Sequence, residues 1–120
     1  YRIVEVRRIN DRILAVKVAI GKKLVNVVAA YAPQVGRSTE EKDKFWWNMM
    51  ELVASYGHGE EVVIGGDLNG HVGNMAEGYE EVHGGYGYGN RNEEGERILE
   101  FCEALEMKIG NTWFRQEENK

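Results

Sequence analysis

An acidic and an amide side chain stand two positions apart, directly after an apolar run. Asp67 and Asn69 follow residues 62–64, three β-branched residues that predict a short strand buried on both faces. Side chains two positions apart in an extended backbone point to the same side of the chain. If the backbone stays extended beyond this strand, Asp67 and Asn69 therefore point the same way. Such a pair suits a metal ion, a water molecule or a phosphate. The competing interpretation is a turn at residues 66–70, because Asp, Asn and Gly are the residues that turns favour.

Tyr31 marks the end of another apolar strand, predicted at residues 24–30. Pro33 stops this strand, because proline has no N–H for a ladder hydrogen bond. Strand–helix–strand order predicts that the two strands are parallel neighbours, which brings Tyr31 and Asp67 to one edge of the sheet. There a phenol can stabilise an oxyanion, an aspartate can orient or deprotonate water, and Asn69 can fix that geometry. The pattern is half of a phosphodiesterase site; the alternative for Tyr31 is packing on the sheet edge.

The other elements form the frame for these residues. Residues 2–9 and 13–20 predict a hairpin that precedes the strand at 24–30. Ser38 and Glu41 match a capping box, so a helix should start there and end with Gly57 at its C′ position. The stripe of this helix predicted to pack in the core consists of Phe45, Trp46, Trp47, Met49, Met50, Leu52, Val53 and Tyr56.

The second half of the chain opens with a long Gly-rich segment, residues 70–91. Tyrosines among glycines can stack on bases, or they can cover an edge of the core, and both interpretations stay open. The residues predicted to bind nucleic acid are Tyr86, Tyr88, Arg91 and Thr112. The histidines, His58, His71 and His83, have no spacing that indicates a zinc site.

A second helix is predicted after Asn92, which has the residue type of an N-cap. Residues 107–109 predict a short strand after it. The buried face of the helix is expected to consist of Ile98, Leu99, Phe101, Cys102 and Leu105.

Composition limits the function classes. The 120 residues suffice for one domain, no apolar run is as long as a membrane span, and the first residue, Tyr1, suggests a piece of a longer protein. The formal net charge is −5, but residues 1–44 carry ten Lys/Arg against five Asp/Glu. The acidic total argues against strong non-specific binding to nucleic acid, yet it permits a locally basic groove. The single cysteine, Cys102, excludes a disulfide within the chain, favours a buried thiol, and fits a nuclear or cytoplasmic location.

Three segments in order resemble one known family. Residues 28–33 and 63–69 are similar to two motifs of the endonuclease/exonuclease/phosphatase superfamily, which includes DNase I and the abasic-site endonucleases. The run from Asn92 to Phe114 is more specific, since it resembles LINE-type retrotransposon endonuclease domains and craniofacial development protein 2-like proteins. The likeness covers nearly the whole chain.

The resemblance implies a fold, a reaction and a cofactor. The fold is an α/β (α+β) four-layer α/β/β/α sandwich with mixed sheets and outer helices, of which residues 1–120 form one partial domain. The implied reaction is hydrolysis of phosphodiester bonds in DNA with Mg²⁺, or Mn²⁺ in its place. By resemblance Asp67 activates water, Asn69 holds Asp67 and the phosphate in line, and Tyr31 stabilises the transition state. Asp67 and Asn69 are also the implied metal ligands.

The family pattern extends beyond these 120 residues. It places its principal metal-binding glutamate before the first strand and its Ser-Asp-His motif after Phe114, and neither is in this sequence. The chain alone is therefore expected to be inactive, because catalytic residues act together. The alternative function is a non-catalytic, retrotransposon-derived interaction or scaffold module. In either case half of a sandwich should expose an apolar sheet face, which predicts a protein partner, self-association or poor solubility.

Overall fold

The computed structural model describes residues 1–70, 73, 78–80, 83–85 and 91–105. The chain divides into two compact units, of which the first is Tyr1–Leu68 and the second begins at Asn69. The predicted short strand at residues 107–109 lies outside the described residues. Among the described residues, no helix combines the length and the apolar character needed to cross a bilayer.

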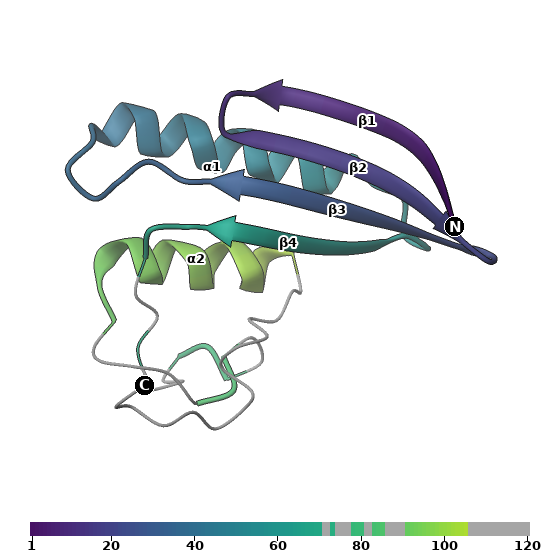
Figure 1. The fold of residues 1–120 in the computed structure, drawn as a ribbon. Coiled ribbons are helices and arrows are strands. Elements are labelled where there is room, and N and C mark those ends of the chain that lie inside the picture. The colour runs from purple at the N-terminus through teal and green to yellow at the C-terminus, as the bar shows by residue number, and fades with distance from the viewer. Residues whose placement is uncertain (71–72, 74–77, 81–82, 86–90, 106–120) are drawn as a thin grey trace, which may run out of the picture. The chain divides into compact units, whose positions relative to one another are not determined.

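The first unit contains a mixed four-stranded sheet in the order β1-β2-β3-β4 (Figure 1). Its strands are β1 (Arg2–Asn10), β2 (Ile13–Ile20), β3 (Lys23–Tyr31) and β4 (Glu61–Asp67). The first three are antiparallel neighbours, and β4 joins β3 in parallel. The predicted hairpin, third strand and parallel fourth strand are confirmed, and with two helices they make the fold α+β.

Helix α1 (Thr39–Ala54) connects β3 to β4. Its start is as predicted, because the Ser38 hydroxyl accepts a hydrogen bond from the Glu41 N–H at 3.2 Å. Its predicted end is wrong: Ser55 is the C-cap, and Gly57 lies beyond the C′ position. The Ser55 hydroxyl donates to the Leu52 carbonyl at 2.6 Å and its N–H donates to the Glu51 carbonyl at 3.1 Å. These bonds satisfy the last turn without a glycine.

The core of this unit lies between α1 and one face of the sheet. In the view of Figure 1 the helix runs behind the strands. Trp47, predicted in the core stripe, is 66% exposed, because it lies two residues from Phe45 and so points to the opposite side of the helix. The buried residues that meet in this core are Ile13, Ala15, Val28, Ala30, Phe45, Trp46, Met49 and Leu52.

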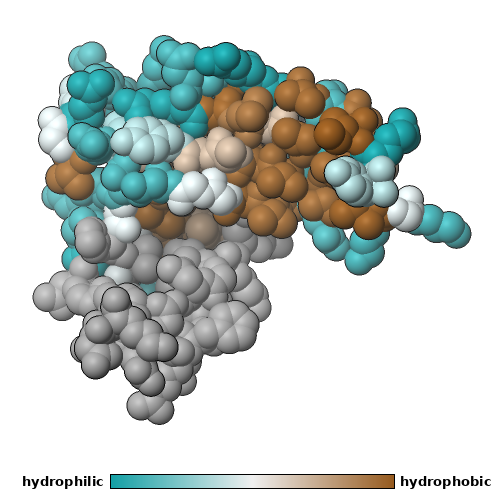
Figure 2. Space-filling view, in the orientation of Figure 1, coloured by the Kyte–Doolittle hydropathy of each residue, from teal (hydrophilic) through white to brown (hydrophobic). Residues whose placement is uncertain are grey.

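The opposite face of the sheet is exposed and apolar, as predicted. Cross-strand pairs such as Leu14 with Ala29 and Val27 with Val63 share this face, since paired positions point the same way. Figure 2 shows the hydrophobic surface gathered over the strands. We call this surface the open sheet face, and its large exposed residues are Ile3, Val6, Leu14, Ile20, Val27, Tyr31 and Val63.

A polar network lies at the other end of the sheet face that α1 covers. Asn26 is fully buried, and its Nδ2 donates to Glu60 Oε1 at 3.0 Å. Lys17 Nζ lies 2.8 Å from the same carboxylate oxygen, and the Gly57 N–H donates to Oε2 at 3.0 Å. These bonds, that of Lys17 first, stabilise the carboxylate and lower the pKa of Glu60 to about 2. Glu60 therefore stays ionised and ties the start of β4 to β2 and β3.

The second unit contains helix α2 (Glu93–Ala104). Asn92 is its N-cap as predicted, since the side-chain oxygen accepts from the Gly95 N–H at 2.8 Å. A Cβ on Gly70 would lie 2.8 Å from the Glu94 carbonyl carbon and 2.9 Å from its oxygen, so only glycine permits this close approach of loop and helix backbone. The predicted buried face is confirmed for Ile98, Leu99, Phe101 and Cys102, and burial raises the pKa of the Cys102 thiol to about 11. This cysteine is a packing residue.

Candidate functional site

The two strand ends that carry Tyr31 and Asp67 lie side by side. Tyr31 and Asp67 are cross-strand partners at the last position of the parallel β3–β4 pairing. The Ala32 N–H extends the ladder by donating to the Asp67 carbonyl at 2.9 Å. Both residues are exposed, Tyr31 to 48%. The predicted neighbourhood of the phenol and the carboxylate at one sheet edge is therefore present.

Local sequence explains why both strands end here. Pro33 cannot donate to a ladder, so β3 stops at Tyr31. Gly66 has a φ of +127°, which L-residues rarely adopt, and an added Cβ would lie 2.0 Å from the Ala30 carbonyl oxygen. Glycine thus lets β4 approach β3 closely just before Asp67. The pairing at this end of the sheet holds Asp67 beside Tyr31.

Asn69 does not continue the strand. Its φ is +50°, in the left-handed region that asparagine tolerates better than most residues. The expectation of an extended backbone from Asp67 through Asn69 is therefore wrong, so the alternation rule does not place the two side chains on one side of the chain. The alternative of a turn over residues 66–70 is not borne out either, since residues 66 and 67 belong to β4. Asn69 opens the second unit. Its catalytic and metal-binding roles stay predictions.

Arg12 is a site residue that the sequence analysis missed. Its Nη1 donates to the Tyr31 carbonyl at 3.2 Å, and its carbonyl accepts from the Tyr31 N–H at 2.8 Å. The guanidinium carbon lies 5.7 Å from the centre of the Tyr31 ring, within the range of a cation–π contact. Arg12 lies in the β1–β2 turn, directly before β2. The antiparallel pairing of β2 with β3 was the available signal, because it carries this turn to the end of β3.

A pocket of about 420 Å³ adjoins Tyr31 within the first unit. Arg8 and Arg12 give it positive charge, and Asp11 gives it one carboxylate. Its lining residues are Arg8, Asn10, Asp11, Arg12, Ile13, Leu14, Ala29, Ala30, Tyr31 and Gly66. A locally basic hollow thus accompanies the tyrosine, although the whole chain is acidic.

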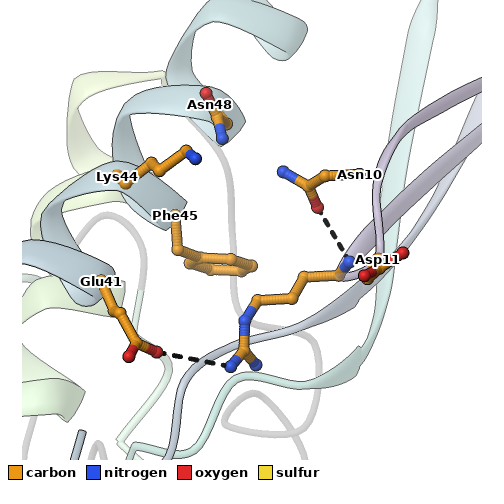
Figure 3. A pocket seen from close by; sticks show the side chains of 7 residues that line it. Asn10, Asp11, Glu41, Lys44, Phe45 and Asn48 are labelled. Atoms are coloured by element: carbon orange, nitrogen blue, oxygen red, sulfur yellow. Dashed lines mark hydrogen bonds and ion pairs between the residues drawn. The ribbon is translucent and has the colours of Figure 1, made fainter. Parts of the chain in front are cut away.

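A second hollow of about 230 Å³ lies between the β1–β2 turn and α1 (Figure 3). Arg12 also lines this one, with Nη2 3.7 Å from Glu41 Oε2. The Asn10 side-chain oxygen accepts from the Arg12 N–H at 2.8 Å and fixes the turn. Arg12 is therefore shared by both hollows. The others in this lining are Asn10, Asp11, Glu41, Lys44, Phe45 and Asn48.

The predicted nucleic-acid residues are covered only in part. Tyr86, Tyr88 and Thr112 lie outside the described residues. Arg91 is described, and its guanidinium lies 5.0 Å from the centre of the Tyr79 ring in the second unit. This is a cation–π contact that fixes both side chains.

Two of the three histidines are described. His58 is exposed after α1, as predicted, and His71 lies outside the described residues. His83 is 1% exposed; its Nε2 lies 3.0 Å from the Gly73 carbonyl, and its Nδ1 accepts from the Gly85 N–H at 2.9 Å. Both ring nitrogens are therefore engaged by backbone groups of the same loop. His83 is a structural residue of its loop.

The described residues do not complete a metal centre. Within the described part of the chain, no three His, Cys, Asp or Glu side chains come close enough to hold one ion. Asp67 supplies a carboxylate at the sheet edge, which suits Mg²⁺ as one ligand of several.

The structure defines the first unit as an α+β unit in which Tyr31 and Asp67 are paired where two parallel strands end. The sequence is similar to craniofacial development protein 2 of Bos taurus, with 30% identity over 107 residues. It is 27% identical over 107 residues to the protein of the same name from Tragulus javanicus. Both alignments cover 89% of this chain and 18% of the relative, so the chain spans less than a fifth of these curated relatives. No family model matches the chain, and no solved structure matches it significantly.

Proposed function

We propose that this chain is the central part of a DNase I-like, Mg²⁺-dependent endonuclease that hydrolyses phosphodiester bonds in DNA. The observation that carries the proposal is the cross-strand pairing of Tyr31 with Asp67, since two motifs distant in sequence meet at one edge. The similarity to craniofacial development protein 2 supports it, because the sequence motifs resemble the same family.

The chemistry that this edge supports is attack of water on a phosphodiester. Asp67, exposed at the strand end, would orient and deprotonate the water, a task for a carboxylate within hydrogen-bond reach. The Tyr31 phenol would donate to the oxygen on which negative charge develops. Asn69, two residues further on, would orient Asp67 and the phosphate.

Mg²⁺, or Mn²⁺ in its place, would supply charge neutralisation at the phosphate oxygens. Asp67 and Asn69 are the ligands we propose for it. Further ligands are required, because the described residues hold no group of three ligating side chains. We propose that the longer protein supplies a metal-binding glutamate ahead of Tyr1 and the catalytic histidine after Lys120, as the family resemblance implies.

A plasmid-nicking comparison tests this proposal. We expect the 120-residue chain with Mg²⁺ to leave supercoiled plasmid intact, and a chain extended by both flanking portions to nick it. The reason is that separated members of a catalytic set retain little of its activity. Isothermal titration with Mn²⁺ accompanies the assay and should show weak binding to the short chain and tighter binding to the long one. Absence of nicking and of metal binding by the long chain would refute the proposal.

The second candidate is a non-catalytic interaction module, and the open sheet face favours it. Large aliphatic side chains on it are exposed, Val27 to 43% and Val63 to 54%. A second copy of the chain fits this face, because the edge strands have opposite charge: β1 carries three arginines and one glutamate, whereas β4 carries one glutamate and one aspartate. Face-to-face packing of two sheets with β1 over β4 would bury the aliphatic centre and pair the charged edges.

Self-association through the open sheet face is directly measurable. We expect light scattering after size exclusion to give a dimer for the purified chain, and a monomer for Val27→Lys, because a buried lysine ammonium without a partner opposes sheet packing. Val35→Lys is the matched control, since Val35 is 56% exposed in the loop before α1, outside the sheet. Circular dichroism confirms that the variants fold. A monomeric wild-type chain at micromolar concentration would remove this candidate.

A further inference from the structure

We propose that the pocket beside Tyr31 is a subsite for a backbone phosphate of the polynucleotide, adjacent to the phosphate that reacts. Arg8 and Arg12 would be its cationic ligands. The inference rests on the proposed function, since it deepens the same site by naming where flanking nucleic acid is held.

The pocket has the size and charge for a phosphate group and part of a sugar. Its volume is about 420 Å³, and Arg8 of β1 and Arg12, directly before β2, line it together with Tyr31. The Arg8 side chain is 74% exposed, and its ion pair with Asp11 at 3.2 Å is equally open to water. Exposed ion pairs contribute little to stability, so Arg8 can leave the Asp11 carboxylate and bind a phosphate oxygen at a small cost in free energy.

Arg12 can also release its acidic neighbour. The Glu41 carboxylate lies 3.7 Å from Arg12 Nη2 but 3.3 Å from Arg37 Nε. Glu41 therefore keeps a cationic partner when Arg12 turns toward the pocket. A guanidinium has five N–H donors, and one of them already holds the Tyr31 carbonyl. The others remain for the paired hydrogen bonds that arginine makes to phosphate.

The position of Arg12 places this phosphate next to the proposed reacting group. Its guanidinium contacts the Tyr31 ring at 5.7 Å and shares the pocket with Gly66, the residue before Asp67. A strand that seats one phosphate between Arg8 and Arg12 would therefore pass the Tyr31–Asp67 edge. Binding of the flanking phosphate would thus position the reacting phosphate beside Tyr31 and Asp67.

The test is fluorescence anisotropy of a labelled duplex oligonucleotide with the chain, in a series of salt concentrations without divalent metal. Each of Arg8→Gln and Arg12→Gln should weaken binding about eightfold at 0.1 M salt and lower the salt slope by about 1, the effect of one lost phosphate contact. Arg2→Gln is the matched control, because Arg2 is an exposed arginine of β1 outside the pocket. It should change the affinity less than twofold. Arg8→Gln guards against misfolding, since its side chain is mostly in water.

A second probe separates this inference from the proposed function. Inorganic phosphate titrated into the isotope-labelled chain should shift the NMR signals of Arg8, Arg12 and Tyr31. Duplex binding with an unchanged slope in both variants would overturn the subsite and leave the endonuclease proposal intact. Phosphate shifts without any duplex binding would support an anion subsite and count against DNA as the substrate. If phosphate shifts none of these NMR signals and neither variant changes the salt slope, the subsite is overturned.

Discussion

Replacing Gly66 with alanine should destabilise the first unit by roughly 3–5 kcal/mol. The φ of Gly66 is +127°, and the new Cβ would lie 2.0 Å from the Ala30 carbonyl oxygen and 3.1 Å from the Ala30 nitrogen. These are backbone atoms in the β3–β4 ladder, so they cannot move aside as a flexible side chain would. Urea denaturation followed by circular dichroism and tryptophan fluorescence measures the loss.

Gly65→Ala is the control for this prediction. A Cβ on Gly65 meets no atom within 4 Å, and its φ lies outside the range where L-residues are strained. Its effect should therefore be within about 1 kcal/mol, since it changes mainly the entropy of the unfolded chain. Similar urea midpoints for the two variants would contradict the close approach of β4 to β3 at Gly66.

The sequence predicted the first unit well because its signals are local and agree with one another. Strand-like residues 2–9 and 13–20, separated by the turn signal Asn10-Asp11, predict a hairpin that precedes the strand at residues 24–30, and the Ser38 cap marks the helix start. Strand–helix–strand order then leaves a parallel β3–β4 pair as the usual outcome. From that pairing the neighbourhood of Tyr31 and Asp67 follows without any knowledge of side-chain packing.

What the sequence did not predict depends on backbone detail or on distant partners. Asn69 turns into the left-handed region, and the alternation rule that places Asp67 and Asn69 together applies only to extended backbone. Arg12 reaches Tyr31 through the antiparallel register of β2 and β3, which aligns residues 19 positions apart. Trp47 is exposed because a helix has two sides and hydrophobicity alone does not distinguish them.

In a chain extended by both flanks, Asp67→Asn should lower the rate of plasmid nicking by about 10²–10⁴-fold. The substitution keeps the shape of the side chain but removes the carboxylate that would take the proton from water. Tyr31→Phe removes one hydrogen-bond donor to the developing oxyanion and should lower the rate by about 10²-fold. Initial rates with Mg²⁺ and excess plasmid give both values. The control is Asp43→Asn, an exposed aspartate on α1, which should leave the rate within about twofold.

The double variant Tyr31→Phe with Asp67→Asn decides whether these residues form one site. Residues that act on the same transition state are strongly non-additive, so the double variant should lose far less than the product of the two single losses. The physical reason for this non-additivity is the pairing of Tyr31 with Asp67 at the ends of β3 and β4, because both side chains would act on the same phosphate. Tyr31→Phe with Asp43→Asn should be additive. If both double variants proved additive, Tyr31 and Asp67 would be neighbours in the sheet without a common reaction, and the exposed tyrosine would belong to the open sheet face as a binding residue.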